Sequence, residues 1–188
     1  MAASDSETPR DALIATLYEM FRTLGFQGVS IGDISRQTGL GRSSLYYHFP
    51  GGKDDMAQSV ARTAVDWVKA NVIAPLNAPG DREHRTAAML AGVETLFRDG
   101  QAPCLIASMT MAGAPPPVRD ILAAALADWL AALEAMLVDT GASAESAQAA
   151  ASTAISRIEG ALIVARALNQ PAVFAQQIAE ARAGLMTA

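Results

Sequence analysis

The side chains best suited to bind another molecule are concentrated between Ile34 and Lys53. Two apolar positions there, Leu45 and Phe49, are surrounded by polar, aromatic and cationic residues, which are Arg42, Ser43, Ser44, Tyr46, Tyr47 and His48. The segment carries three cations and no acid, although the whole chain has a net charge of −5. Hydroxyl groups suit the edges of bases and cations suit phosphates, so the pattern indicates a local surface for a nucleic acid.

Glycine and proline positions predict how short helices present this segment. The spacing of apolar residues predicts a first helix over 9–24 and a short second helix that begins after the cap Ser30 and ends at Thr38. A third short helix begins at Gly41 or Arg42 and is broken after residue 49 by a proline and two glycines. Two short helices joined by a glycine-bearing turn and braced by a longer helix form a helix-turn-helix unit.

The adjacent residues Tyr46 and Tyr47 have two interpretations. Taken in isolation, they are ordinary half-buried residues of a helix. Successive side chains on a helix point about 100° apart, however, so both rings cannot be buried in one small core. We therefore expect this pair and Arg42 to project outward, while Leu45 and Phe49 face the core.

The rest of the chain consists of longer, alanine-rich segments with few turn signals. Hydrophobic residues make up 51% of the sequence and period-two alternation is missing, so we predict an all-α fold. The expected number of helices is about nine. Helical spacing places the later ones at about residues 53–72, 82–99, 104–111, 115–138, 143–168 and 171–185.

The segment around the third helix is similar to the TetR family of bacterial transcriptional regulators. The match spans about residues 10–60, and its core is Thr38-Gly39-Leu40-Gly41-Arg42-Ser43-Ser44-Leu45-Tyr46-Tyr47-His48-Phe49. Two further strings resemble the LmrA/YxaF-like branch, and they are Phe49-Pro50-Gly51-Gly52-Lys53-Asp54 and Cys104-Leu105-Ile106-Ala107. The resemblance implies a three-helix DNA-binding domain at residues 1–53 and a helical domain for ligand binding and dimerisation at 54–188.

The resemblance also implies roles for individual residues. The side chains implied to approach bases are Ser43 and Ser44, helped by Tyr47. The side chains implied to hold phosphates are Arg42, Tyr46, Tyr47, His48 and Lys53. Ser30 and Thr38 are implied to anchor the DNA backbone near the first turns of their helices. Gly41 stands where the family often has a serine; glycine still caps a helix and permits close approach, but a phosphate-binding hydroxyl is lost.

A regulator of this kind needs a cavity whose filling changes the distance between two recognition helices, with the helix after Lys53 as the lever. Methionines and aromatic residues suit such an adaptable apolar pocket for a small-molecule effector. The same residue types are also what any helix bundle buries in its core. The candidates are Trp67, Met89, Val93, Phe97, Cys104, Ile106, Met109, Met111, Trp129 and Met136.

Arg157 is the charged candidate in this second domain, on a largely apolar helix. It pairs with an acidic ligand or, as the favoured structural alternative, with Glu159 or Glu134 across packed helices. Cys104 has no basic residue near it in sequence to lower the pKa of its thiol. A small buried hydrophobe is therefore favoured over a redox sensor at that position.

The helix expected at 143–168, with Ser143 as its cap, has two apolar faces. One contains Ile155, Ile158 and Leu162. The second is rich in alanine and contains Ala147, Ala150, Ala154, Ala161, Ala165 and Leu168. One face suits the core of the subunit and the other permits close approach of a partner helix. We expect a homodimer through the helices at 143–168 and 171–185.

Other classes of protein find little support in the sequence. It has no nucleophile, base and acid in a recognisable arrangement and no phosphate loop, so we expect no catalysis and no cofactor. One cysteine and two histidines leave little for a metal site, and we expect none. The longest uncharged run, 100–118, is broken by prolines and a glycine, and the first ten residues lack the pattern of a secretory signal. We expect a cytoplasmic protein without a membrane partner.

These observations predict a dimeric regulator that binds a palindromic double-stranded DNA operator. It would repress transcription until a small apolar or amphipathic effector enters the second domain. The alternatives are a helical protein-interaction module, an activator, or a regulator that needs no ligand. An acidic recognition surface would favour the protein-interaction module, whereas the segment from Ile34 to Lys53 is basic.

Overall fold

The computed structural model describes residues 9–111 and 113–188, and every regular element in that part of the chain is helical. Helix α4 (Gly52–Val68) continues through the π-helical segment η1 (Lys69–Ile73) into α5 (Ala74–Asn77). If α4, η1 and α5 are counted as one continuous helix, the described residues contain nine helices. This confirms the predicted all-α fold. The others are α1 (Pro9–Leu24), α2 (Ile31–Thr38), α3 (Arg42–His48), α6 (Arg82–Phe97), α7 (Leu105–Met111), α8 (Pro116–Asp139), α9 (Ala144–Leu168) and α10 (Pro171–Thr187).

The chain forms two compact units. Unit 1 contains the residues up to Val65 together with Leu105–Leu122, and unit 2 contains Asp66–Cys104 and Ala123–Ala188. The predicted boundary at residue 53 is a division by function and stays a prediction. By packing, the unit that holds α1, α2 and α3 extends further along α4 and includes α7.

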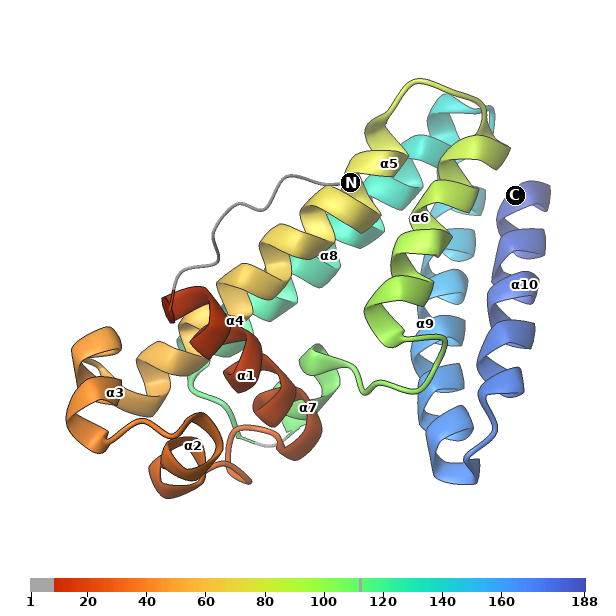
Figure 1. Cartoon of the computed structure of the whole chain (residues 1–188). Helices are drawn as coiled ribbons and strands as arrows, with labels where there is room; N and C mark the ends of the chain where they lie inside the picture. Colours follow the sequence, from red (N-terminus) through yellow and green to blue (C-terminus); the bar gives the residue numbers. More distant parts are fainter. Residues whose placement is uncertain (1–8, 112) are drawn as a thin grey trace, which may run out of the picture. The chain divides into compact units, whose positions relative to one another are not determined.

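Unit 1 is built around one apolar core to which α1, α2, α3, α4 and α7 all contribute. Phe21 of α1, Ile34 of α2 and Leu45 of α3 are completely buried in it. In Figure 1 the short helices α2 and α3 lie near the beginning of α4, and α7 lies beside α1. Helices this short derive most of their stability from packing, so the buried side chains of α2 and α3 fix their orientation.

Unit 2 contains α9 and α10, which pack side by side, with α6 next to α10 (Figure 1). Both helix starts follow the sequence signals. Ser143 caps α9 by accepting a hydrogen bond from the backbone N–H of Ser146 at 3.2 Å, and Pro171 occupies the first turn of α10. The rings of Phe97 and Phe174 meet edge to face, with centroids 6.2 Å apart, and join α6 to α10.

The alanine-rich face of α9 differs from the prediction. Most of its alanines are buried within the single chain, where α9 packs along α10. Because alanine is small, these residues let the two helices approach closely, so the face is used inside the subunit rather than left open to a partner. The large apolar residues of α9 that are exposed are Ile163, Val164 and Leu168, of which only Leu168 belongs to the predicted face.

Helix α8 is long and apolar enough to cross a membrane by length and composition alone, with a mean hydropathy of 1.9 over 18 residues. It includes only the end of the uncharged run 100–118 considered from the sequence. Its buried residues recur at helical spacing, and they include Leu122, Ala125, Trp129, Leu133 and Met136. Such a stripe is the pattern of a helix that packs one side into a core.

Candidate nucleic-acid interface

Helix α3 presents polar side chains on one side and buries the other. Leu45 and, at the end of the helix, Phe49 are completely buried. Tyr47 is 82% exposed and Tyr46 is 47% exposed. The remaining exposed residues of the helix are Arg42, Ser43 and Ser44, and His48 is half-buried. The predicted outward projection of both tyrosines and of Arg42 is confirmed.

Local hydrogen bonds fix the turn between α2 and α3. Gly39 has a φ of +70° and ends α2 in the left-handed region, which favours glycine. The Thr38 hydroxyl donates to the Ile34 carbonyl at 2.7 Å and accepts from the backbone N–H of Leu40 at 3.3 Å. Gly41 then begins α3 with an extended backbone and no side-chain cap. The Thr38 hydroxyl therefore supports the turn, whatever contact it makes with DNA.

Ser30 caps α2 in a reciprocal capping box with Asp33. Ser30 Oγ accepts a hydrogen bond from the backbone N–H of Asp33 at 3.1 Å. In return, the Asp33 carboxylate accepts from the Ser30 hydroxyl at 2.5 Å and from the Ser30 backbone N–H at 3.0 Å. These bonds lower the pKa of Asp33, and the Arg36 guanidinium, which pairs with the same carboxylate, lowers it further. The Ser30 hydroxyl thus has a structural role at the start of α2.

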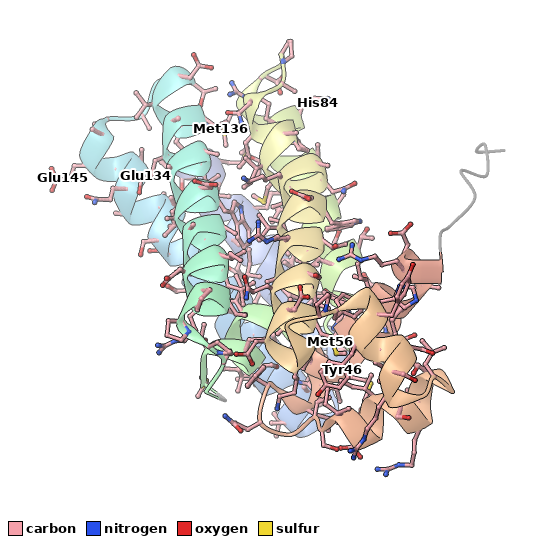
Figure 2. All side chains as sticks on the ribbon, turned by 90° about the vertical axis from the view of Figure 1, so that its left-hand side faces the viewer. Tyr46, Met56, His84, Glu134, Met136 and Glu145 are labelled. Atoms are coloured by element: carbon pink, nitrogen blue, oxygen red, sulfur yellow. The ribbon has the colours of Figure 1, made fainter. Side chains whose placement is uncertain are left out.

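Tyr46 links α3 to the beginning of α4. Gly52, the first residue of α4, has a φ of +66°, and a Cβ atom there would lie 3.3 Å from Tyr46 Cε1. Figure 2 shows the labelled Tyr46 beside the first turns of α4. Tyr47 meets the ring of His48 edge to face, with centroids 5.4 Å apart. Of the two tyrosines, Tyr47 is the one that extends furthest into solvent.

Lys53 differs from the other predicted phosphate contacts because its ammonium group binds within unit 1. Lys53 Nζ donates to the carbonyls of Phe26 at 3.1 Å and Val29 at 3.0 Å. It also lies 4.0 Å from the centroid of the Phe26 ring. Lys53 is half-buried, and its contacts join residues far apart in the sequence, which local patterns do not reveal.

Taken together, the predicted DNA contacts lie on α2, on α3, in the turn between them and at the start of α4. Thr38, His48 and Lys53 are half-buried, and the other seven are exposed. Sequence reasoning missed Arg10 of α1, whose guanidinium lies 5.2 Å from the centroid of the Phe49 ring and donates to Ser59 Oγ at 3.3 Å. This arginine brings a further cation next to the buried end of α3.

Comparison with known proteins identifies the family. A family model described as "Bacterial regulatory proteins, tetR family" matches residues 13–60, which include α2 and α3. A second, described as "Transcriptional regulator LmrA/YxaF-like, C-terminal domain", matches residues 85–180, about half of the chain. The chain belongs to the TetR family. Its C-terminal match assigns it to the LmrA/YxaF-like branch, so this protein is a DNA-binding transcriptional regulator.

Individual relatives agree with this assignment to TetR-family regulators. The HTH-type transcriptional regulator LmrA of Bacillus subtilis is 25% identical over 160 residues, which cover 82% of this chain and 85% of LmrA. An uncharacterized HTH-type transcriptional regulator of Mycobacterium tuberculosis is 26% identical over 167 residues, 84% of each chain. These relatives are named as regulators rather than enzymes.

Solved structures of TetR-family regulators share the fold. One from Legionella pneumophila superposes with a TM-score of 0.81 at 20% identity, covering 96% of this chain and 97% of that one. Another, from Streptomyces coelicolor, gives a TM-score of 0.80 at 20% identity, covering 95% of this chain and 94% of that one. They support the helical fold of this TetR-family chain.

The predicted effector-binding residues of this TetR-family regulator are divided between the two units. Ile106 is half-buried, Met109 is buried and Met111 is 87% exposed, all in unit 1. In unit 2, Trp67 and Arg157 are half-buried. The others in unit 2 are buried, and they are Met89, Val93, Phe97, Cys104, Trp129 and Met136.

Unit 2 contains polar side-chain groups in a largely apolar environment. Trp129 Nε1 and Thr86 Oγ1 are buried and have no hydrogen-bond partner among the residues that the structure describes. Sequence reasoning missed Glu159 as a half-buried acid of α9. It follows Ile155 by four residues and precedes Leu162 by three, so helical spacing already put it on the core-facing stripe of α9. Burial raises the pKa of Glu159, and a hydrogen bond with the Cys104 side chain partly opposes that shift.

Arg157 has neither of the acidic partners considered from the sequence. Its Nη1 donates to Gln177 Oε1 of α10 at 2.8 Å. It also lines a groove of about 250 Å³ between α9 and α10, together with Glu180 and small residues that include Gly184. Arg157 therefore lies on the surface formed by these two helices, and a role in binding an acidic ligand stays a prediction.

Proposed function

We propose that this protein is a repressor that binds a palindromic operator as a homodimer and is released by a small apolar or amphipathic effector. The observation that carries the proposal is the orientation of α3. Its hydroxyl and cationic side chains are exposed while Leu45 and Phe49 are completely buried, as a helix that enters the major groove requires. We propose that the protein acts in the cytoplasm and has no membrane partner.

In this proposal some residues of α2 and α3 contact bases and others contact phosphates. Ser43 and Ser44, with the extended ring of Tyr47, approach base edges. Arg42, Tyr46, Tyr47 and His48 contact phosphates, and Ser30 and Thr38 anchor the backbone at the ends of α2. Gly41, which has no side chain, lets the start of α3 approach a phosphate closely.

The homodimer is proposed to form through α9 and α10. Ile163 is 67% exposed, Leu168 57% and Val164 45%, so the C-terminal half of α9 carries three large apolar side chains in solvent, of which Val164 and Leu168 share one face. Gly160 of α9 and Gly184 of α10 have no atom within 4 Å of an added Cβ. A glycine inside an exposed helix lowers stability by about 0.5–1 kcal/mol, and close approach of a partner helix offsets that cost.

The effector is proposed to bind in unit 2 around Trp129. A buried donor without an acceptor costs about 1–3 kcal/mol, so a ligand oxygen that accepts from Trp129 Nε1 would gain that energy back. Met89, Phe97 and Met136, which are predicted pocket residues and are buried in unit 2, are proposed to supply the apolar surroundings for the rest of such a molecule. An effector that binds better when the spacing of the two DNA-binding domains does not fit the operator shifts the population toward that spacing, and the operator is released.

The DNA-binding proposal is tested with duplexes from the region upstream of the protein's own gene. We expect specific binding whose affinity falls steeply with salt, and a strong loss of specificity for Ser43→Ala and Ser44→Ala combined. Arg182→Ala is the matched control, because Arg182 is exposed on α10 and pairs with Glu83 of α6. Binding that does not change with salt, or equal losses in both variants, would contradict the proposal.

The dimer is tested by light scattering. Ile163→Glu combined with Leu168→Glu places charge on the exposed apolar surface of α9 without touching the buried core, and we expect a folded monomer. Ala91→Glu on the exposed side of α6 is the control and stays dimeric. A dimer that survives the double substitution rejects this interface.

The effector proposal is tested by a thermal-shift screen of apolar and amphipathic compounds. A true effector raises Tm and weakens operator binding in the same concentration range. Trp129→Phe keeps an aromatic ring but removes the indole N–H, so it weakens the response to a hydrogen-bonding effector. A compound whose effects are the same on both proteins does not bind at Trp129.

A further inference from the structure

The ammonium group of Lys53 connects two parts of unit 1 that lie far apart in the sequence. Lys53 is in the first turn of α4, and its Nζ donates to the backbone carbonyls of Phe26 and Val29, which belong to the connection between α1 and α2. The same ammonium lies 4.0 Å from the centroid of the Phe26 ring. Two of its three N–H groups are therefore occupied inside the protein.

The two carbonyls belong to a connection that the core already holds firmly. Phe26 is buried and its ring stacks on Phe21, with centroids 6.2 Å apart, and Val29 is completely buried. A Cβ at Gly28 would lie 2.2 Å from the Leu24 carbonyl oxygen, so the chain passes very close to the end of α1. Lys53 thus binds a part of unit 1 that has little room to move.

The residue after Val29 is Ser30, the cap that starts α2. Lys53 therefore fixes the carbonyl that immediately precedes the first helix of the helix-turn-helix. On its other side, the first residue of α4, Gly52, packs against the ring of Tyr46 on α3. The start of α4 is consequently in contact with the beginning of α2 through Lys53 and with α3 through Gly52.

We infer that Lys53 is a positioning residue: its ammonium group holds the start of α2 against the first turn of α4, and it does not neutralise a DNA phosphate. The inference rests on the proposed contact of α2 and α3 with DNA, and it specifies how that surface is held together. Any movement of the first turn of α4 is passed to the Ser30 cap by this lysine. Lys53 therefore acts on operator affinity through the placement of Ser30.

The first test uses the fact that the chain has only two lysines, Lys53 and Lys69. Lys69 is exposed on η1 and makes an ion pair with Asp128 at 3.8 Å. We expect acetic anhydride to modify Lys53 several-fold more slowly than Lys69 in the protein without DNA, with no further protection of Lys53 in the operator complex. Mass spectrometry of the labelled peptides measures both rates. Equal rates without DNA, with protection of Lys53 only in the complex, would overturn the inference.

The second test compares Lys53→Met with the matched control Lys69→Met. Methionine keeps the length of the side chain and removes the ammonium. We expect Lys53→Met to weaken operator binding about tenfold with an unchanged slope of log affinity against log salt, and Lys69→Met to change neither. A phosphate contact would instead lower the slope by about 0.9 for each subunit, and that result would contradict the inference.

A double-mutant cycle separates positioning from general stabilisation. If Lys53 acts through Ser30, then Ser30→Ala weakens binding less in the Lys53→Met background than in the wild type. Additive losses would show that the lysine acts elsewhere. Absence of operator binding by the wild-type protein would contradict the proposed function alone, because the labelling rates without DNA still test the Lys53 contacts. Those rates need no variant, so they also stand if Lys53→Met fails to fold.

Discussion

Gly92 of α6 lies directly against the backbone of Asn71 in the π-helical segment η1, so closely that a Cβ at residue 92 would be 2.1 Å from the Asn71 carbonyl oxygen. Both residues belong to unit 2. The Asn71 side chain donates to the Trp67 carbonyl at 2.8 Å, which supplies one bond at the point where the α-helical pattern changes. The π-helical turn of η1 can therefore pack closely against α6 because residue 92 has no side chain.

Gly92→Ala is expected to destabilise the protein by about 3 kcal/mol, because the backbone of Asn71 leaves the new methyl group no space. Urea unfolding followed by circular dichroism measures the loss. The control is Gly32→Ala in α2, where the nearest atom to the added Cβ is 3.6 Å away and we expect little change. Equal stability of Gly92→Ala and the wild type would show that η1 and α6 separate easily.

Arg42→Ala is expected to lower the slope of log operator affinity against log salt by about 0.9 for each subunit, with no loss of stability. Arg42 is exposed at the start of α3, and the described residues contain no ion-pair partner for it. Arg36→Ala is the comparison: its charge is already paired with Asp33, so we expect a smaller change in slope. Filter binding at four or more salt concentrations measures both, and identical slopes for Arg42→Ala and wild type would remove Arg42 from the phosphate contacts.

Ser30→Ala is expected to reduce the free energy of unfolding by about 1 kcal/mol, the usual value of a helix cap. The same change removes hydrogen bonds that lower the pKa of Asp33, so that pKa should rise toward its ordinary value, which NMR titration measures. Ser44→Ala is the matched control, since Ser44 is exposed in α3 and its stability effect should stay within about 0.5 kcal/mol. If both serines affect only DNA binding, the capping role is refuted.

The helix boundaries and the exposed face of α3 could be predicted because they depend on neighbours in the sequence. Ser30, Ser143 and Pro171 start their helices through bonds or dihedral angles within one turn. The buried positions of Leu45 and Phe49 follow from helical periodicity alone. Once Leu45 and Phe49 face the core, the helix geometry also determines which way the side chains between them point.

Contacts across the fold could not be predicted in the same way. The side chain of Lys53 is long enough to reach either outward or back to the α1–α2 connection, and only the folded chain decides between them. Periodicity identified an alanine-rich face on α9 but not what covers it, and α10 of the same chain does. Arg157 likewise met an amide, Gln177 of α10, rather than Glu159 or Glu134, the two acids considered from the sequence.

Glu159 makes the stability of unit 2 depend on pH. Burial raises its pKa above the ordinary value of 4.5, with a hydrogen bond to Cys104 acting in the opposite direction. The folded state therefore holds this proton more tightly than the unfolded state does. The stabilising contribution is complete below about pH 4.5 and is lost as the pH rises through the raised pKa of the folded state.

Glu159→Gln removes this titration, so the difference in unfolding free energy between wild type and variant should move steadily in favour of the variant as the pH rises from 4.5. Urea unfolding at intervals between pH 4 and 8 measures that difference. Glu145→Gln is the control, since Glu145 lies exposed in the first turn of the same helix (Figure 2), and its difference from wild type should stay level over this range. Parallel curves for wild type and Glu159→Gln would mean that the carboxyl group of Glu159 titrates as if it were in water.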